Sequence, residues 1–94
     1  MNVTINNLRC RAAEIEENLN EAGFIAEVKP YFAYGKYSYI LHFYNNAEKK
    51  HTHEGYKQIS FSLGTKAECY YKLNEAYYQA LEHEKYYKFQ SDKY

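Results

Sequence analysis

The sequence predicts a small α+β domain in which a three-stranded antiparallel sheet carries both helices on one face. Two observations predict this fold: an amphipathic helical pattern near each end of the chain, and three segments of alternating hydrophobic and polar residues between them. A sheet with one apolar and one polar face is typical of an antiparallel sheet covered on a single side. The 94 residues leave room for one domain. We expect this domain over residues 1–83, with residues 84–94 as a C-terminal tail or helix extension.

The first element is a helix over residues 8–22. Its hydrophobic residues follow one another at steps of four, three, four and three, which places them on one stripe: Leu8, Ala12, Ile15, Leu19 and Ala22. Asn6 or Asn7 is expected to cap the helix, since an asparagine oxygen can accept a free backbone amide. Gly23 is expected to end it in the left-handed conformation, and Phe24 then folds back on Leu19.

Three strands are expected next, over residues 24–29, 37–44 and 58–63, because hydrophobic and polar residues alternate in each. Pro30 follows the first strand and has no N–H for a ladder, so the strand ends, bulges or lies at a sheet edge there. Gly35 marks the turn that leads to the second strand. Residues 45–55 form a long polar loop between the second and third strands.

A second long helix is expected to begin at Thr65. Thr65 and Glu68 form a capping box, in which each side chain accepts the free backbone amide of the other residue. Gly64 and Lys66 flank this start. Together with the threonine hydroxyl they leave open a second interpretation, an anion site at the helix N-terminus.

The C-terminal third contains three adjacent tyrosine pairs: Tyr70-Tyr71, Tyr77-Tyr78 and Tyr86-Tyr87. The first two pairs are seven residues apart and share one broad apolar helix face, so both are expected in the core. The third pair comes nine residues later, about two and a half helical turns, and falls on the opposite side. Either the helix ends or bends near His83, or this pair and Phe89 project outward and form a candidate partner surface.

Composition and charge limit the function. Hydrophobic residues make up 46% of the chain and charged residues 26%, which is typical of a soluble globular protein. The 12 basic and 12 acidic residues give no net charge, which argues against tight binding of nucleic acid irrespective of sequence. No apolar run reaches the length of a signal peptide or membrane span, so we expect a cytoplasmic protein without a membrane partner.

The sequence favours neither an enzyme nor a cofactor. It has no glycine-rich phosphate loop and no nucleophile motif, and Cys10 and Cys69 are expected to be reduced thiols. His51, His53 and Glu54 are potential zinc ligands in one loop, but a structural zinc site needs four ligands at recognised spacings. We therefore predict no metal site.

Nucleic-acid binding is the alternative function, with Arg9, Arg11, Lys36 and Lys66 as its candidate residues. The expected order of helix, three strands and helix resembles that of double-stranded-RNA-binding domains, over residues 6–81. The resemblance implies RNA contacts from the first helix, from the turn after the first strand and from the start of the last helix. Those regions contain the four basic residues. The last helix nevertheless opens with one lysine and Glu68 where that family has a basic cluster.

The preferred prediction is a small non-catalytic protein that binds another protein. Candidate contact residues lie on the polar sheet face and near the C-terminus: Ile40, His42, Tyr44, Tyr56, Tyr86, Tyr87 and Phe89. The partner is expected to be a protein, with a second copy of the chain in a homodimer as one form. Abundant lysine, asparagine and tyrosine indicate an AT-rich genome and suggest a phage or mobile element. A host-defence inhibitor of the anti-CRISPR type is one function expected of such a chain.

Overall fold

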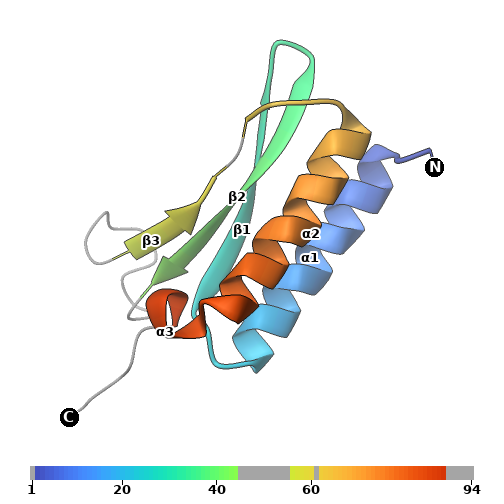
Figure 1. Ribbon diagram of the computed structural model, residues 1–94. Helices are drawn as coiled ribbons and strands as arrows, with labels where there is room; N and C mark the ends of the chain where they lie inside the picture. The colour runs from blue at the N-terminus through green and yellow to red at the C-terminus, as the bar shows by residue number, and fades with distance from the viewer. Residues whose placement is uncertain (1, 45–55, 61, 89–94) are drawn as a thin grey trace.

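The computed structural model describes residues 2–44, 56–60 and 62–88, and it confirms the predicted element order. The elements are α1 (Ile5–Glu21), β1 (Ala26–Ala33), β2 (Lys36–Tyr44), β3 (Tyr56–Ile59), α2 (Lys66–Glu82) and the short α3 (Glu84–Tyr87). The strands form an antiparallel sheet in the order β1-β2-β3, so that β2 is central. α1 and α2 lie side by side, run in the same direction and cover one face of the sheet (Figure 1).

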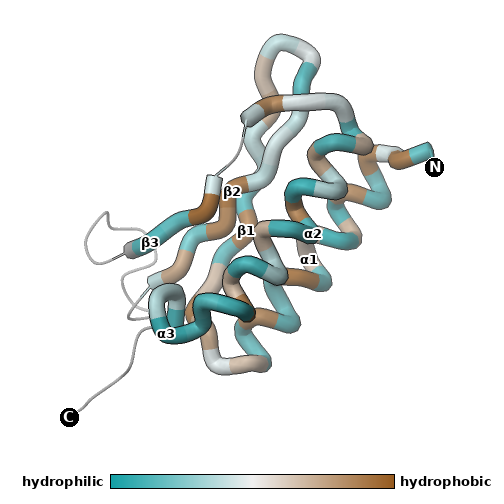
Figure 2. Tube along the Cα trace, in the orientation of Figure 1, coloured by the Kyte–Doolittle hydropathy of each residue, from teal (hydrophilic) through white to brown (hydrophobic). Residues whose placement is uncertain are grey.

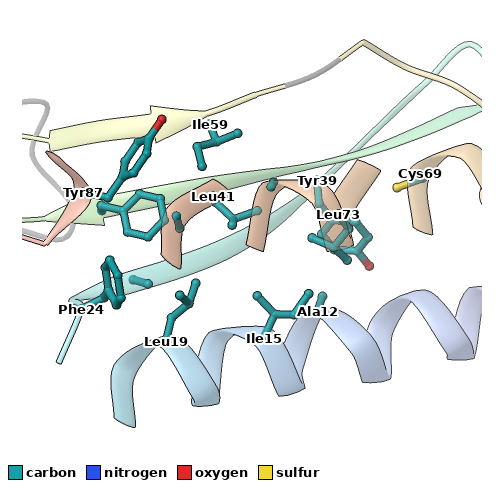
Figure 3. Close-up of a cluster of buried hydrophobic side chains, with 14 of the residues drawn as sticks. Ala12, Ile15, Leu19, Phe24, Tyr39, Leu41, Ile59, Cys69, Leu73 and Tyr87 are labelled. Carbon is teal, nitrogen blue, oxygen red and sulfur yellow. The ribbon is translucent and has the colours of Figure 1, made fainter. Parts of the chain in front are cut away.

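The core lies between this helix pair and the sheet. The helices contribute one stripe each: Leu8, Ala12, Ile15 and Leu19 from α1, and Cys69, Leu73, Ala76 and Ala80 from α2. Tyr39, Leu41 and Phe43 of β2 point toward these stripes, because every second side chain of a strand faces the same way. Figure 3 shows the side chains converging, and Figure 2 shows hydrophobic and hydrophilic positions alternating along both helices.

α1 begins before the predicted residue. Thr4, rather than Asn6 or Asn7, is the N-cap: its side chain accepts the amide of Asn7 at 3.1 Å, and Asn7 Oδ1 accepts the Thr4 amide at 2.9 Å. Asn7 lies three residues after Thr4 and reaches back to its amide, as a glutamate does in a capping box. Asn7, one of the two predicted caps, is therefore the capping-box partner of Thr4. Gly23 ends the helix as predicted, with φ at +99°, and the Phe24 amide donates to Leu19 O at 3.0 Å.

β1 continues through Pro30 to Ala33, four residues beyond the predicted end. The strand lies at the sheet edge, which is one of the alternatives predicted for a proline there. Ile25 O accepts the Tyr44 amide at 2.8 Å, so the backbone groups of Ile25 point toward β2. Because this direction alternates along a strand, the backbone groups of the odd-numbered residues of β1 point toward β2 and those of the even-numbered ones away from it. The nitrogen of Pro30 therefore points away from β2, and the ladder loses no hydrogen bond.

Side chains of α1 close the free edge of β1. Asn20 Nδ2 donates to Ala26 O at 3.0 Å, and Asn20 Oδ1 accepts the Ala26 amide at 3.1 Å. Glu16 Oε1 accepts the Val28 amide at 2.8 Å. Since Pro30 has no N–H, none of these three strand positions offers a free donor to an added strand.

The first two tyrosine pairs are split between core and surface. Tyr70 and Tyr77 are partly buried against the core, as predicted, whereas Tyr71 and Tyr78 are exposed. The prediction that all four belong to the core is therefore wrong. The buried stripe of α2 is centred on small and aliphatic residues, and the second tyrosine of each pair lies roughly half a turn away from it.

The third pair is redirected by a break at His83, which is one of the two alternatives that the sequence leaves open. The backbone of His83 has φ at −110° and ψ at 42°, and α3 follows it. Tyr87 is only 7% exposed and packs on Phe43 with ring centroids 4.9 Å apart, whereas Tyr86 is exposed. α3 thus completes the same core (Figure 3), and Phe89 lies outside the described residues.

Candidate protein-binding site

Three exposed aromatic side chains lie on the hairpin that β1 and β2 form. Tyr31, Phe32 and Tyr34 are 52%, 45% and 95% exposed, and we call these three residues the hairpin patch. Tyr31 and Phe32 are consecutive in β1, so their side chains lie on opposite faces of the hairpin, and Tyr34 lies in the turn. The hairpin tip extends beyond the ends of both helices (Figure 1), and its hydropathy is intermediate (Figure 2). Tyrosine combines an apolar ring with a polar hydroxyl, so such a patch can be exposed to water and still bind a protein.

The turn of the hairpin places Tyr34 in a conformation that tyrosine disfavours. Tyr34 and Gly35 form a two-residue turn with φ values of 54° and 72°. Two positive φ values are the pattern of a type I′ turn, which suits the twist of the strands and favours asparagine followed by glycine. The left-handed backbone costs an ordinary L-residue roughly 1–2 kcal/mol. With 95% of its side chain exposed, Tyr34 has no packing within the fold that offsets this cost.

Contacts at the base of the hairpin hold Phe32 and the β2 backbone in position. The Phe32 ring meets the rings of Tyr37 and Tyr39 edge-on, with centroids 5.2 Å and 6.0 Å apart. The Tyr37 amide donates to Gly64 O at 2.8 Å, and the Gly64 amide donates to Tyr37 O at 3.0 Å, which ties β2 to the segment before α2. A surface that is ordered before binding loses less conformational entropy in a complex.

Two basic side chains lie on the same face of the hairpin as Tyr31. Lys29 lies two residues before Tyr31 in β1, and its Nζ is 3.5 Å from Glu27 Oε1. Lys36 follows the turn and is exposed. An aromatic centre with a charged rim is the arrangement found in protein interfaces.

The sheet-face residues chosen from the sequence are less accessible than the hairpin patch. Ile40 and His42 are partly buried, and Tyr44 is buried with its hydroxyl 3.3 Å from Glu27 Oε1. The His42 and Tyr44 rings stack with centroids 6.1 Å apart. Tyr44 itself is therefore hardly accessible, and contact of these residues with a partner stays a prediction.

The C-terminal candidates divide in the same way. Tyr87 is buried, whereas Tyr86 is exposed and has Lys57 Nζ 4.1 Å from its ring centroid. The side chain of Tyr56 and all of Phe89 lie outside the described part of the chain. α3 and the hairpin tip are at opposite ends of the molecule (Figure 1), so Tyr86 and the hairpin patch are separate surfaces.

The structure also separates the two arginines of the nucleic-acid alternative. Arg11 faces α2, where its Nε donates to Asn74 Oδ1 at 2.6 Å and its guanidinium lies 5.6 Å from the Tyr77 ring centroid. Arg11 also pairs with Glu14. Arg9 lies on the other flank of α1, beside β1. The two arginines therefore do not form one basic surface.

The anion site considered at the start of α2 is occupied by a side chain of the protein. Glu68 Oε1 accepts the Thr65 amide at 3.0 Å, and the Thr65 hydroxyl oxygen accepts the Glu68 amide at 3.2 Å. Hydrogen bonds from Thr65 hold the pKa of Glu68 below its usual value. Lys36 is near enough to contribute to that lowering, and Lys66 begins the same helix. A carboxylate thus sits where a phosphate would bind.

Thiol and metal chemistry has little basis in the residues that the structure describes. Cys10 is exposed and Cys69 is buried, and burial raises the pKa of the Cys69 thiol to about 11, so that it is protonated near neutral pH. Within the described ranges no three His, Cys, Asp or Glu side chains are grouped to hold a metal ion. His51, His53 and Glu54 lie outside those ranges.

The chain matches no protein-family model, no curated protein and no solved structure. Among the described helices, none has the length and apolar character needed to span a membrane. What the fold and surface define is a small α+β domain with an aromatic hairpin that extends from it, and the functional argument rests on that surface.

Proposed function

We propose that the protein binds another protein through the hairpin patch and catalyses no reaction. Tyr34 is the observation that carries the proposal. It is a large aromatic side chain, 95% exposed, at a turn position whose positive φ favours asparagine or glycine. Backbone strain that no contact in the fold offsets suggests a function for the strained residue. At Tyr34 the strained turn holds the aromatic side chain in solvent.

The surroundings of Tyr34 indicate the kind of partner. Tyrosine and other aromatic residues are frequent among the few residues that dominate binding energy, and they act by filling pockets on the partner. Lys29 and Lys36 beside the patch favour a partner with carboxylates around such a pocket, which would raise the association rate. The hairpin is thus suited to insert into an apolar recess with an acidic rim.

The finer expectations from the sequence accompany this proposal and rest on the sequence alone. They are a cytoplasmic location, an origin in a phage or mobile element, and inhibition of a host protein. Self-association through the hairpin patch is the alternative form of protein binding, and the experiment below separates it from binding of a different protein.

Photo-crosslinking from position 34 tests the proposal. Tyr34 is replaced by p-benzoylphenylalanine, and the protein is irradiated in a lysate of the organism that encodes it. We expect adducts with one protein species, identified by mass spectrometry. The matched control has the same crosslinker at position 78, an exposed tyrosine on α2, and should not form that adduct.

The other outcomes have defined meanings. An adduct between two copies of the chain would assign the hairpin patch to self-association instead of a different partner. Adducts with nucleic acid, the same adduct from both positions, or no adduct from position 34 would each overturn the proposal.

A further inference from the structure

A groove of about 250 Å³ lies between α1 and β1, next to the hairpin. Its walls are mostly apolar and come from Ala12, Ala13, Val28 and Pro30. The backbone of β1 is closed here by Glu16 and by the proline, as described above. Whatever binds in the groove therefore finds no free backbone amide at Val28 or Pro30.

Two polar side chains in this groove have no partner within the part of the chain that the structure describes. Arg9 makes no hydrogen bond or ion pair there, whereas Arg11 on the opposite flank of α1 makes both. Tyr39 is only 2% exposed, and its hydroxyl has no hydrogen-bond partner among those residues. A hydroxyl that has no protein partner and still reaches solvent can donate a hydrogen bond to a ligand.

The two groups are close enough to act on one ligand. Burial raises the pKa of Tyr39, and the charge of Arg9 acts in the opposite direction. Figure 3 shows the Tyr39 ring extending from β2 toward α1, on the side of Ala12. A cation and a hydroxyl donor beside apolar walls form a site for a carboxylate attached to an apolar group.

We infer that this groove receives a segment of the partner protein in which a carboxylate adjoins an apolar side chain, such as a chain-terminal leucine. Arg9 pairs with the carboxylate, the Tyr39 hydroxyl donates to it, and the alanines and Val28 contact the apolar side chain. The inference rests on the proposed function, because it assigns a second contact to the same partner.

Glu16 sets the direction of the bound segment. It lies seven residues after Arg9, roughly 10 Å along the helix axis, and its Oε1 accepts the Val28 amide. A carboxylate is repelled at that end and attracted at the Arg9 end. α1 begins at the hairpin end of the molecule (Figure 1), so the bound carboxylate lies on the side of the groove that is nearer to the hairpin patch.

An NMR titration with N-acetyl-leucine tests this inference, with N-acetyl-leucinamide as the uncharged probe of similar shape. We expect the acid to shift the amide signals of Ala12, Ala13 and Val28 with a Kd of about a millimolar or weaker. The acid should bind about tenfold more tightly than the amide, as expected for a hydrogen-bonded charge. Arg9→Gln should remove that difference, and Arg11→Gln should keep it.

Equal affinity for acid and amide, or shifts confined to other parts of the chain, would overturn the inference. The result is independent of the crosslinking experiment, because the titration uses no partner protein and leaves the hairpin patch unchanged. If position 34 forms the crosslink but N-acetyl-leucine does not bind the groove, only the inference about the groove is rejected. If N-acetyl-leucine binds the groove but position 34 forms no crosslink, the proposed function is rejected and the groove is a carboxylate site with no protein partner.

Discussion

Replacing Tyr87 by alanine should lower the free energy of unfolding by about 3–5 kcal/mol, as for other large aromatic residues in cores. The ring is 7% exposed and packs on Phe43, which in turn contacts Phe24 with centroids 5.7 Å apart. The Tyr87 hydroxyl also accepts a hydrogen bond from Gln79 Nε2 at 3.1 Å. The substitution leaves a cavity at one end of the core. Urea denaturation followed by circular dichroism measures the loss.

The neighbouring tyrosine supplies the control. Tyr86→Ala should cost about 1 kcal/mol or less, since it removes an exposed ring and its contact with Lys57. Tyr87→Phe should also cost about 1 kcal/mol, the value of the hydrogen bond to Gln79. Equal losses from Tyr86→Ala and Tyr87→Ala would contradict the position of α3 in the core.

Asn20→Ala should lower the free energy of unfolding by about 2–3 kcal/mol. Asn20 satisfies both backbone groups of Ala26, which is buried, and its Nδ2 also donates to Glu16 O at 2.7 Å. Without the side chain the N–H and C=O of Ala26 lose their partners in the fold. Chemical denaturation again gives the measurement.

Asn18→Ala is the matched control on the same helix, because the Asn18 side chain is exposed and makes no hydrogen bond with the described residues. Its effect should stay within about 0.5 kcal/mol. The Asn20 variant should in addition self-associate at high concentration in light scattering, since its β1 edge offers an unpaired amide. If the two asparagine variants have the same stability and the same mass, the side chain of Asn20 does not close the edge.

The sequence predicts the fold well where the signals are local. The hydrophobic stripe of α1 and the alternation in β2 each identify the buried face, and Gly23 marks a helix end that the structure confirms. Tyr71 and Tyr78 were misplaced because tyrosine fits either side of a helix. Which part of a broad apolar sector meets the sheet depends on the small residues at its centre, here Ala76 and Ala80.

The hairpin patch escaped the sequence prediction for a different reason. The alternating pattern of the first strand ends near Pro30, so the sequence assigns Tyr31 and Phe32 to no element. An edge strand nevertheless accommodates a proline whose nitrogen points outward. The two-residue spacing of Tyr34 and Gly35 between alternating segments is a hairpin signal that would have located the patch. The sequence gives no such signal for the groove, because its lining residues come from separate elements that only folding brings together.

The proposal that Tyr34 serves binding at the expense of stability is tested most directly by Tyr34→Asn. Asparagine suits the left-handed position, so the free energy of unfolding should rise by about 0.5–1 kcal/mol. Affinity for the protein crosslinked from position 34 should fall at least about tenfold, as for a central aromatic contact. Tyr78→Asn, the same change on α2, should produce neither effect. A Tyr34→Asn variant that is more stable and binds the partner as tightly as the original protein would contradict the account.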